Sequence, residues 1–133
     1  MKRVSDHIAS VPGFKASGIA SGIKVEGSKD LALIFSQTPA VAAGVFTKNK
    51  VLSHAVVFSR QSLRTSKTFQ AVLINSGNAN ACTSFQGLED CRIIASKLAK
   101  QLDLPNQKIL LASTGIIGVP LPKTKILKSI PKI

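Results

Sequence analysis

Two glycine-containing polar segments hold the residue types best suited to chemistry in this 133-residue chain. The first is Ser113-Thr114-Gly115, in which a hydroxyl side chain stands next to a glycine. Such a pair can offer a side-chain O–H and a backbone N–H to one point, and two donors of this kind stabilise the negative charge that develops on a carbonyl oxygen under attack. Glycine also permits close approach of a substrate, because it has no Cβ. Thr114 and Gly115 are therefore candidate oxyanion-hole residues, with an ordinary turn as the alternative interpretation.

The second segment spans residues 75–81 and contains three asparagines around one glycine. Asparagine tolerates left-handed backbone geometry and bonds to nearby backbone groups, so a purely structural turn is one interpretation. In the other interpretation, Asn75, Asn78 and Asn80 shape a polar pocket or brace the loop that contains Thr114.

Other catalytic patterns find little support. His7 and His54 have no neighbouring acid and nucleophile in a recognisable arrangement, and we expect His54 to lie in a strand as a packing or surface residue. Glycine-rich phosphate-binding motifs are absent. No spacing of histidine and cysteine is typical of zinc, and Cys82 and Cys91 are predicted to be reduced thiols. These patterns favour neither a zinc site nor a bound nucleotide.

The charge balance is strongly basic, with 18 Lys and Arg against 6 Asp and Glu and a formal net charge of +12. Such a surface attracts anions, and a missing remainder of a longer protein would dilute the excess. Nucleic-acid binding is disfavoured, because aromatic stacking platforms and known modules are lacking. Residues 123–133 are purely basic among their charged positions and are predicted to form a basic tail. No secretory leader or membrane span is apparent, which indicates a cytoplasmic location.

The second half of the chain is predicted to form a strand, a helix and a second strand. The strands are expected at 71–74 and 108–112, and Thr83 and Gln86 have the spacing of a capping box at the start of the helix. The helix is indicated by apolar residues that recur every three or four positions, namely Leu88, Cys91, Ile94, Ala95, Leu98 and Leu102. If the strands are parallel through this crossover helix, both following loops emerge at one edge of the sheet, where α/β proteins bind ligands.

The first half is expected to contribute further strands. Residues 18–25 are predicted to form a hairpin, and the apolar run 31–35 is typical of a strand buried on both faces. Thr38-Pro39 should end that strand. Two more strands are expected at 41–47 and 51–59, followed by an exposed connection or short helix over 60–68. The fold class is therefore α/β, with a mixed sheet and a crossover helix.

Several segments together resemble the bifunctional ornithine acetyltransferase/N-acetylglutamate synthase family. The matching segments are Val11-Pro12-Gly13-Phe14, Ser17-Gly18-Ile19, Lys29-Asp30-Leu31-Ala32-Leu33, Ala43-Gly44-Val45-Phe46-Thr47, residues 72–81 and Ser113-Thr114-Gly115-Ile116-Ile117-Gly118. The resemblance extends over residues 11–122 and would cover about the first third of a full-length member. It implies that residues 1–133 are a single partial domain, the N-terminal part of the family's α chain, with a DmpA-like layered fold.

The resemblance also implies a mechanism. Family members cleave themselves before a threonine into α and β chains that remain associated, typically as an α2β2 assembly. The new N-terminal threonine attacks the acetyl group of N-acetylornithine, and glutamate then accepts the acetyl group; acetyl-CoA is an alternative donor in some members. On this pattern Thr114 and Gly115 correspond to the oxyanion-hole pair.

Some features depart from the family pattern. None of the seven threonines lies in a sequence like the cleavage site, which would fall beyond Ile133. Residues 53–57 differ from the expected Ala-Ala-Pro-Val-like stretch, and residues 123–133 lack obvious family features. The resemblance therefore predicts an enzyme part that is inactive alone and supplies an oxyanion hole to the rest of the α chain and the β chain. The alternative hypothesis is an inactive family member that acts as a basic binding protein.

Overall fold

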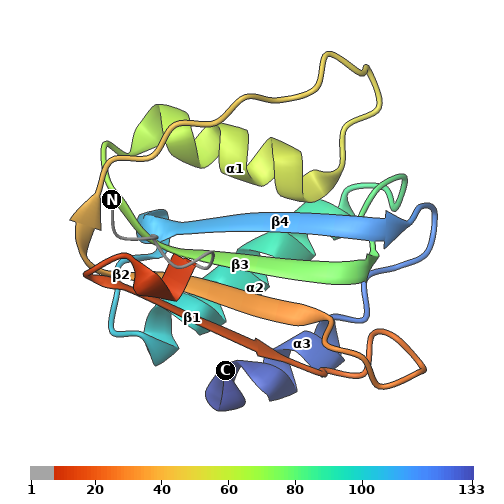
Figure 1. Cartoon of the computed structure of the whole chain (residues 1–133). Helices are drawn as coiled ribbons and strands as arrows, with labels where there is room; N and C mark the ends of the chain where they lie inside the picture. The colour runs from red at the N-terminus through yellow and green to blue at the C-terminus, as the bar shows by residue number, and fades with distance from the viewer. Residues whose placement is uncertain (1–7) are drawn as a thin grey trace, which may run out of the picture.

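A four-stranded mixed sheet forms the centre of the computed structural model, which describes residues 8–133 (Figure 1). In chain order the elements are η1 (Ile8–Ser10), β1 (Phe14–Ile19), β2 (Leu31–Ala40), α1 (His54–Thr65), β3 (Phe69–Asn78), α2 (Gln86–Gln101), η2 (Asn106–Lys108), β4 (Ile109–Ile116), α3 (Lys123–Ser129) and η3 (Ile130–Lys132). The strands are ordered β1-β2-β3-β4. The β1–β2 and β2–β3 pairs are antiparallel and β3–β4 is parallel, which confirms the predicted mixed sheet.

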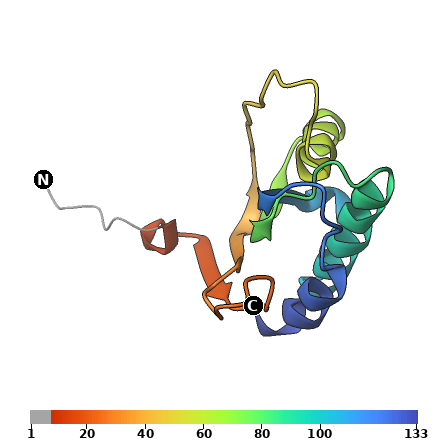
Figure 2. The ribbon, with the colours of Figure 1, turned by 90° about the vertical axis from the view of Figure 1, so that its right-hand side faces the viewer.

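The helices are distributed unevenly around the sheet. Figure 2 shows α2 and α3 together on one face, while α1 lies beyond β4 at the end of the sheet. The predicted crossover is present, because α2 connects the parallel strands β3 and β4. No helix within residues 8–133 is long and apolar enough to cross a membrane.

The core lies between the sheet and α2. The predicted apolar face of α2 is correct, since Cys91, Ile94 and Leu98 are each at most 3% exposed. The expected capping box is wrong: the residue that caps α2 is Phe85, which makes no side-chain capping bond. The Thr83 hydroxyl lies two residues before that cap position and donates to the side-chain oxygen of Asn80.

The C-terminal basic segment folds onto this core. Residues 123–133, which we expected as a tail, form α3 and η3. Their apolar positions Ile126 and Ile130 are each 1% exposed and join the core cluster, while the lysines point elsewhere on the short helix. Ile126 and Ile130 are four residues apart, as on one face of a helix, but the many lysines in this segment made the sequence resemble a solvated tail.

The first half of the chain differs most from the prediction. The expected hairpin over 18–25 is wrong: β1 ends at Ile19, and the antiparallel partner is β2, which begins only at Leu31. The strand predicted at 31–35 is present, but it continues to Ala40 through the expected break. Pro39 is tolerated because the β2–β3 register is irregular between Phe35 and Ala40.

The two strands expected at 41–47 and 51–59 are also wrong. Residues 41–49 have no regular secondary structure, and His54–Thr65 form α1, which includes residues 60–65 of the segment expected as an exposed connection or a short helix. Ser53 caps this helix, since its hydroxyl oxygen accepts a hydrogen bond from the Val56 amide at 3.3 Å. The buried positions of α1 are the small residues Ala55 and Ser59, and the half-buried Phe58 packs against the core.

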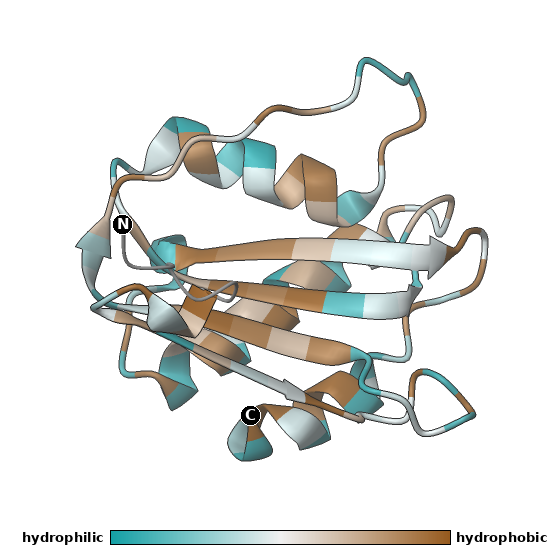
Figure 3. Cartoon of the chain, in the orientation of Figure 1, coloured by the Kyte–Doolittle hydropathy of each residue, from teal (hydrophilic) through white to brown (hydrophobic). Residues whose placement is uncertain are grey.

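The face of the sheet away from α2 and α3 is only partly covered. Side chains alternate along each strand, so Leu33, Leu73 and Leu111 are buried beneath the helices while their neighbours Ile34 and Val72 are half-buried on the opposite face. The run 31–35 is therefore apolar on both sides but buried on one. Figure 3 shows the long apolar stretches of β2, β3 and β4, which become polar toward the carboxyl ends of β3 and β4.

Candidate active site

The two polar segments meet at the carboxyl ends of β3 and β4. In the parallel register Asn75 is opposite Ser113, Ser76 is opposite Thr114 and Gly77 is opposite Gly115. Asn78 also pairs with Thr114. The prediction that both segments share one edge of the sheet is confirmed, although the segments extend the strands rather than forming loops beyond them.

The asparagine side chains are turned inward. Asn75, Asn78 and Asn80 are 5%, 3% and 0% exposed. The Ser113 hydroxyl donates to the side-chain oxygen of Asn75 at 2.6 Å, and the Asn75 amide group donates to the Asn78 carbonyl at 2.8 Å. The Asn80 side chain donates to the Gly87 carbonyl at 3.0 Å and to the Cys91 sulfur at 3.2 Å. These side-chain amides bond to other protein groups. The interpretation that the segment braces the Thr114 segment is therefore supported over the interpretation that it lines a polar pocket.

Thr114, in contrast, is exposed at the end of β4. No hydrogen bond to its hydroxyl is found among residues 8–133, so the hydroxyl is free to bind a ligand. Leu111 is buried beneath the helices, and alternation along the strand therefore places Thr114 on the opposite, partly covered face of the sheet.

The backbone amide of Gly115 faces away from β3, toward the outer edge of the sheet. β4 is the outermost strand, and the amide and carbonyl of Leu111 point away from β3 to the Ser59 hydroxyl, at 2.9 and 2.7 Å. Backbone groups repeat their direction every second residue, and the β3–β4 register is regular from Leu73 to Gly77. The Gly115 N–H therefore points outward as the Leu111 N–H does, next to the Thr114 side chain.

Glycine is required at position 115. Its φ of +134° is rarely adopted by residues with a side chain, and an added Cβ would lie 2.3 Å from the carbonyl carbon of Gly77 and 2.4 Å from the amide nitrogen of Asn78. The two polar segments thus approach each other more closely than any other residue would allow. This contact fixes where the Gly115 amide lies relative to β3.

The turn that follows Gly115 is tied down along its length. The Ala79 amide donates to the Ile116 carbonyl and the Gly118 amide donates to the Ala81 carbonyl, both at 2.9 Å. At the end of the turn, Lys123 forms an ion pair of 2.5 Å with Asp90, whose side chain is 7% exposed on α2. The Thr114–Gly115 pair therefore belongs to a well-supported corner.

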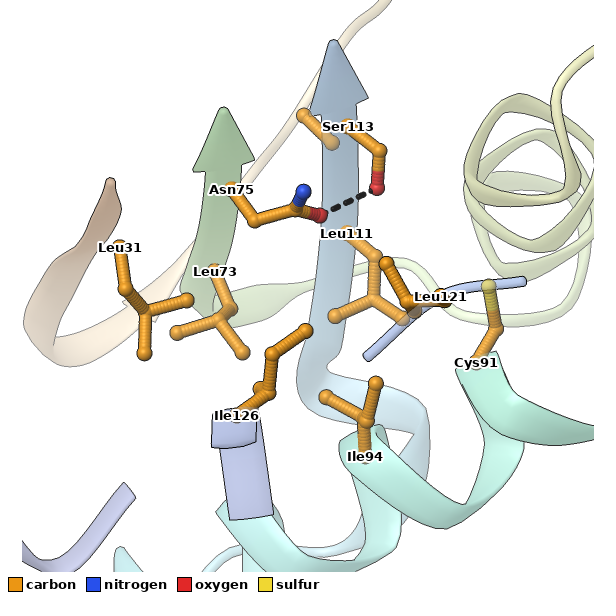
Figure 4. A pocket seen from close by; sticks show the side chains of 10 residues that line it. Leu31, Leu73, Asn75, Cys91, Ile94, Leu111, Ser113, Leu121 and Ile126 are labelled. Carbon is orange, nitrogen blue, oxygen red and sulfur yellow. Dashed lines mark hydrogen bonds between the residues drawn. The ribbon is translucent and has the colours of Figure 1, made fainter. Parts of the chain in front are cut away.

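The interior beneath this corner has no room for a substrate. Figure 4 shows the Asn75–Ser113 hydrogen bond above a cavity lined by Leu73, Ile94 and Ile126, and its volume is about 10 Å³. A space of this size holds roughly one water molecule. Any substrate must therefore approach Thr114 from the exposed side.

Two groups near the site have shifted pKa values. Burial raises the pKa of the Cys91 thiol to about 12, and the hydrogen bond from Asn80 only partly offsets this effect. Burial also opposes ionisation of Asp30, but the hydrogen bonds from the Lys24 and Ser21 amides outweigh it and lower the pKa of that carboxyl.

The remaining candidates do not join the site chemically. His54 is the first residue of α1 rather than part of a strand, and its backbone amide donates to the Asn80 carbonyl at 2.8 Å. His7 lies outside the described residues. Among residues 8–133, no three His, Cys, Asp or Glu side chains are placed to hold a metal ion. Sequence reasoning gave no role to Asp30, which holds the turn after β1, although residues 29–33 are among the segments that resemble the family. It also missed Ser59, which lies in no distinctive motif.

A free hydroxyl and a glycine amide at the carboxyl edge of a mixed sheet define an α/β protein with a polar site at adjacent parallel strand ends. The match to known proteins makes the assignment specific: the chain belongs to the ArgJ family, whose model matches residues 15–133. The match includes the basic C-terminal segment, so our expectation that residues 123–133 lack family features is wrong.

Individual relatives agree with this assignment. The chain is 45% identical to arginine biosynthesis bifunctional protein ArgJ 1 of Clostridium acetobutylicum over 95% of its length, and this is 31% of the relative. Among solved structures, the Bacillus halodurans ArgJ protein superposes with a TM-score of 0.90 at 36% identity, over 94% of this chain and 65% of that one. Ornithine acetyltransferase of Mycobacterium tuberculosis, solved with ornithine, gives a TM-score of 0.88 at 40% identity, over 92% of this chain and 66% of that one. The chain thus spans about a third of the length of its curated relatives.

Proposed function

We propose that this chain supplies the oxyanion hole of an acetyltransferase in arginine biosynthesis, which moves an acetyl group from N-acetylornithine to glutamate. Membership of the ArgJ family and the likeness to the ornithine-bound Mycobacterium tuberculosis enzyme support the reaction class. The observation that carries the proposal is the pairing of the free Thr114 hydroxyl with the outward-facing Gly115 amide.

In this proposal the two donors act on one oxygen. A threonine hydroxyl from another part of the enzyme attacks the acetyl carbonyl of N-acetylornithine, and the carbonyl oxygen becomes negatively charged. The Thr114 hydroxyl and the Gly115 amide both donate to that oxygen, an interaction that is strongest in the tetrahedral state. The carbon–nitrogen bond then breaks, and ornithine leaves as an amine that has taken up the proton lost by the attacking threonine hydroxyl. The amine of glutamate attacks the resulting acetyl-threonine ester in the same way and restores the free threonine.

The nucleophile belongs to a partner segment. The partners in this proposal are the remaining α chain and the β chain, assembled as α2β2, with acetyl-CoA as an alternative acetyl donor and no metal or bound cofactor. Three exposed apolar residues surround the corner and support such a docking: Ile116 and Ile117 are each 63% exposed and Val119 is 48% exposed.

Complementation tests this proposal. The chain is co-expressed with the part of the Clostridium acetobutylicum relative that follows the matched segment, and transfer of acetyl from N-acetylornithine to glutamate is measured in the purified complex. The relative itself, split at the corresponding position and co-expressed as two pieces, is the control for whether such a division permits assembly. We expect activity from the mixed pair and none from either part alone.

Two results would count against the proposal. One is a split relative that is active while the mixed pair assembles but shows no acetyl transfer. The other is acetyl transfer by this chain alone, which would place the nucleophile within residues 1–133. A complex that fails to assemble is replaced by a fusion of the same two segments in one chain, so that the test is always completed.

A further inference from the structure

Asn78 connects both flanks of residues 114–119, the end of β4 with the turn that follows it, through its side chain on one flank and its backbone carbonyl on the other. The side-chain amide of Asn78 donates to the carbonyls of Val119 and Pro120, at 3.0 and 3.3 Å, which lie just after the turn. Its side-chain oxygen accepts a hydrogen bond from the Asn80 amide at 2.8 Å. Each atom of this amide group that can bond is therefore in use.

The same residue is connected to the residue before the turn. The carbonyl of Asn78 accepts from the Asn75 side chain at 2.8 Å, and the other end of that side chain accepts from the Ser113 hydroxyl at 2.6 Å. The turn is thus held at Ser113, one residue before Thr114, and at Val119. Both attachments pass through Asn78, and we call this arrangement the asparagine relay, formed by Asn75 and Asn78.

The relay places two buried amide side chains beneath an exposed segment. Asn75 and Asn78 are 5% and 3% exposed, and burying amide groups costs free energy that only complete hydrogen bonding recovers. The turn itself is exposed from Thr114 onward, so the relay buries polar groups in order to hold a surface segment. In that segment the unbonded Thr114 hydroxyl and the outward Gly115 amide are donors on neighbouring residues.

We propose that Asn78 is a positioning residue for acetyl transfer: through the asparagine relay it holds the Thr114 hydroxyl and the Gly115 amide at the separation that one oxyanion requires. The inference rests on the proposed function. Asn78 does not contact the substrate in this proposal, since its side chain is buried and the hydrogen-bonding atoms of that side chain are occupied. Donors that are placed in advance contribute to the rate without reorganising during the reaction, so a loosened turn lowers kcat.

The decisive variant is Asn78→Asp in the complemented enzyme. The carboxylate has nearly the same shape and still accepts from the Asn80 amide, but it cannot donate and it repels the carbonyls of Val119 and Pro120. We expect kcat to fall by about 100-fold, the order found for loss of one oxyanion donor, while KM changes by less than about threefold. Asn106→Asp adds the same charge in η2, at the opposite end of β4, and should leave both constants unchanged.

A second control separates positioning from lost stability. Ser59→Ala also removes two buried hydrogen bonds to β4, at Leu111, without touching the turn. It should lower the melting temperature comparably and leave kcat nearly unchanged at a temperature where all variants are folded. A double-mutant cycle with Thr114→Val is expected to be non-additive, because both changes remove the same stabilisation of the oxyanion.

The outcomes separate the two proposals. If wild type is active and depends on Thr114, but Asn78→Asp keeps its rate or slows only as much as Ser59→Ala, the inference is wrong and the proposed function stands. If wild type transfers no acetyl group, the proposed function is wrong. The inference is then decided by nuclear magnetic resonance on the 133-residue chain: the Gly115 amide signal should shift or broaden in Asn78→Asp and not in Asn106→Asp. An unmoved Gly115 signal would overturn the positioning role in either case.

Discussion

Replacing Gly115 by alanine tests the close contact between the two polar segments. The new Cβ would lie 2.3 Å from backbone of Gly77, where no side-chain end can move aside, and φ would remain at +134°. Strained backbone of this kind costs about 1–3 kcal/mol, and overpacking against a fixed neighbour costs about 1–3 kcal/mol more. We therefore expect Gly115→Ala to lower the free energy of unfolding by about 4 kcal/mol, a large part of the roughly 5–15 kcal/mol typical of a domain.

Gly118 provides a matched control within the same turn. Its φ is +80°, but nothing lies within 4 Å of an added Cβ, so Gly118→Ala should cost only the backbone strain of about 1–2 kcal/mol. Urea unfolding followed by circular dichroism measures both variants, since the chain has no Trp or Tyr for fluorescence. A difference of about 2–3 kcal/mol corresponds to a midpoint shift of roughly 1–2 M urea. Equal losses in the two variants would refute the close approach of Gly115 to Gly77.

Three further outcomes follow from the same structure. Ser59→Ala should lower the free energy of unfolding by about 2–3 kcal/mol, because it leaves a buried amide and carbonyl of β4 unpaired. Ser62→Ala, at a half-buried position of the same helix, should lower it by less than about 1 kcal/mol. Similar losses would contradict the role of Ser59 in binding the edge of β4. Because its pKa is lowered, the Asp30 carboxylate contributes fully to stability above pH 3.8, the ordinary pKa, and this contribution is lost as the pH falls from 3.8 through the lowered pKa. Asp30→Asn should therefore reduce the loss of stability measured as the pH is lowered through this range. An unchanged loss would contradict this role of Asp30. At pH 8 a thiol reagent should label the exposed Cys82 at once and the buried Cys91 only after unfolding. A pKa of about 12 for Cys91 leaves about one molecule in 10⁴ with this thiol ionised. Rapid labelling of both cysteines would contradict the burial of Cys91.

The second half of the fold could be predicted because its signals agree with one another. The apolar spacing of α2 is regular over four turns, and a helix between two short apolar strands leads directly to a parallel crossover. That geometry alone brought Asn75 and Ser113 to one edge of the sheet. The candidate residues Thr114 and Gly115 needed the family resemblance as well, because a threonine before a glycine is common in turns.

The first half could not be predicted from local pattern because long-range contacts determine it. The fully buried residues of α1 are small, and Ser59 lies where it bonds the edge of β4, 52 residues away in sequence. The turn after β1 depends on Asp30, whose carboxylate gathers two amides that no periodicity identifies. Similarly, Ile126 and Ile130 become core residues only because the sheet and α2 leave space for them.

The most direct test of the central claim is the rate of the complemented enzyme with Thr114 replaced in two ways. Thr114→Val keeps the shape of the side chain and removes its hydroxyl, whereas Thr114→Ser keeps the hydroxyl and removes a methyl group. We predict that kcat falls by about 10²–10³-fold in Thr114→Val and by less than about tenfold in Thr114→Ser. Equal rates in the two variants would show that the hydroxyl does not stabilise the oxyanion, and the function proposed for this corner of the sheet would be wrong.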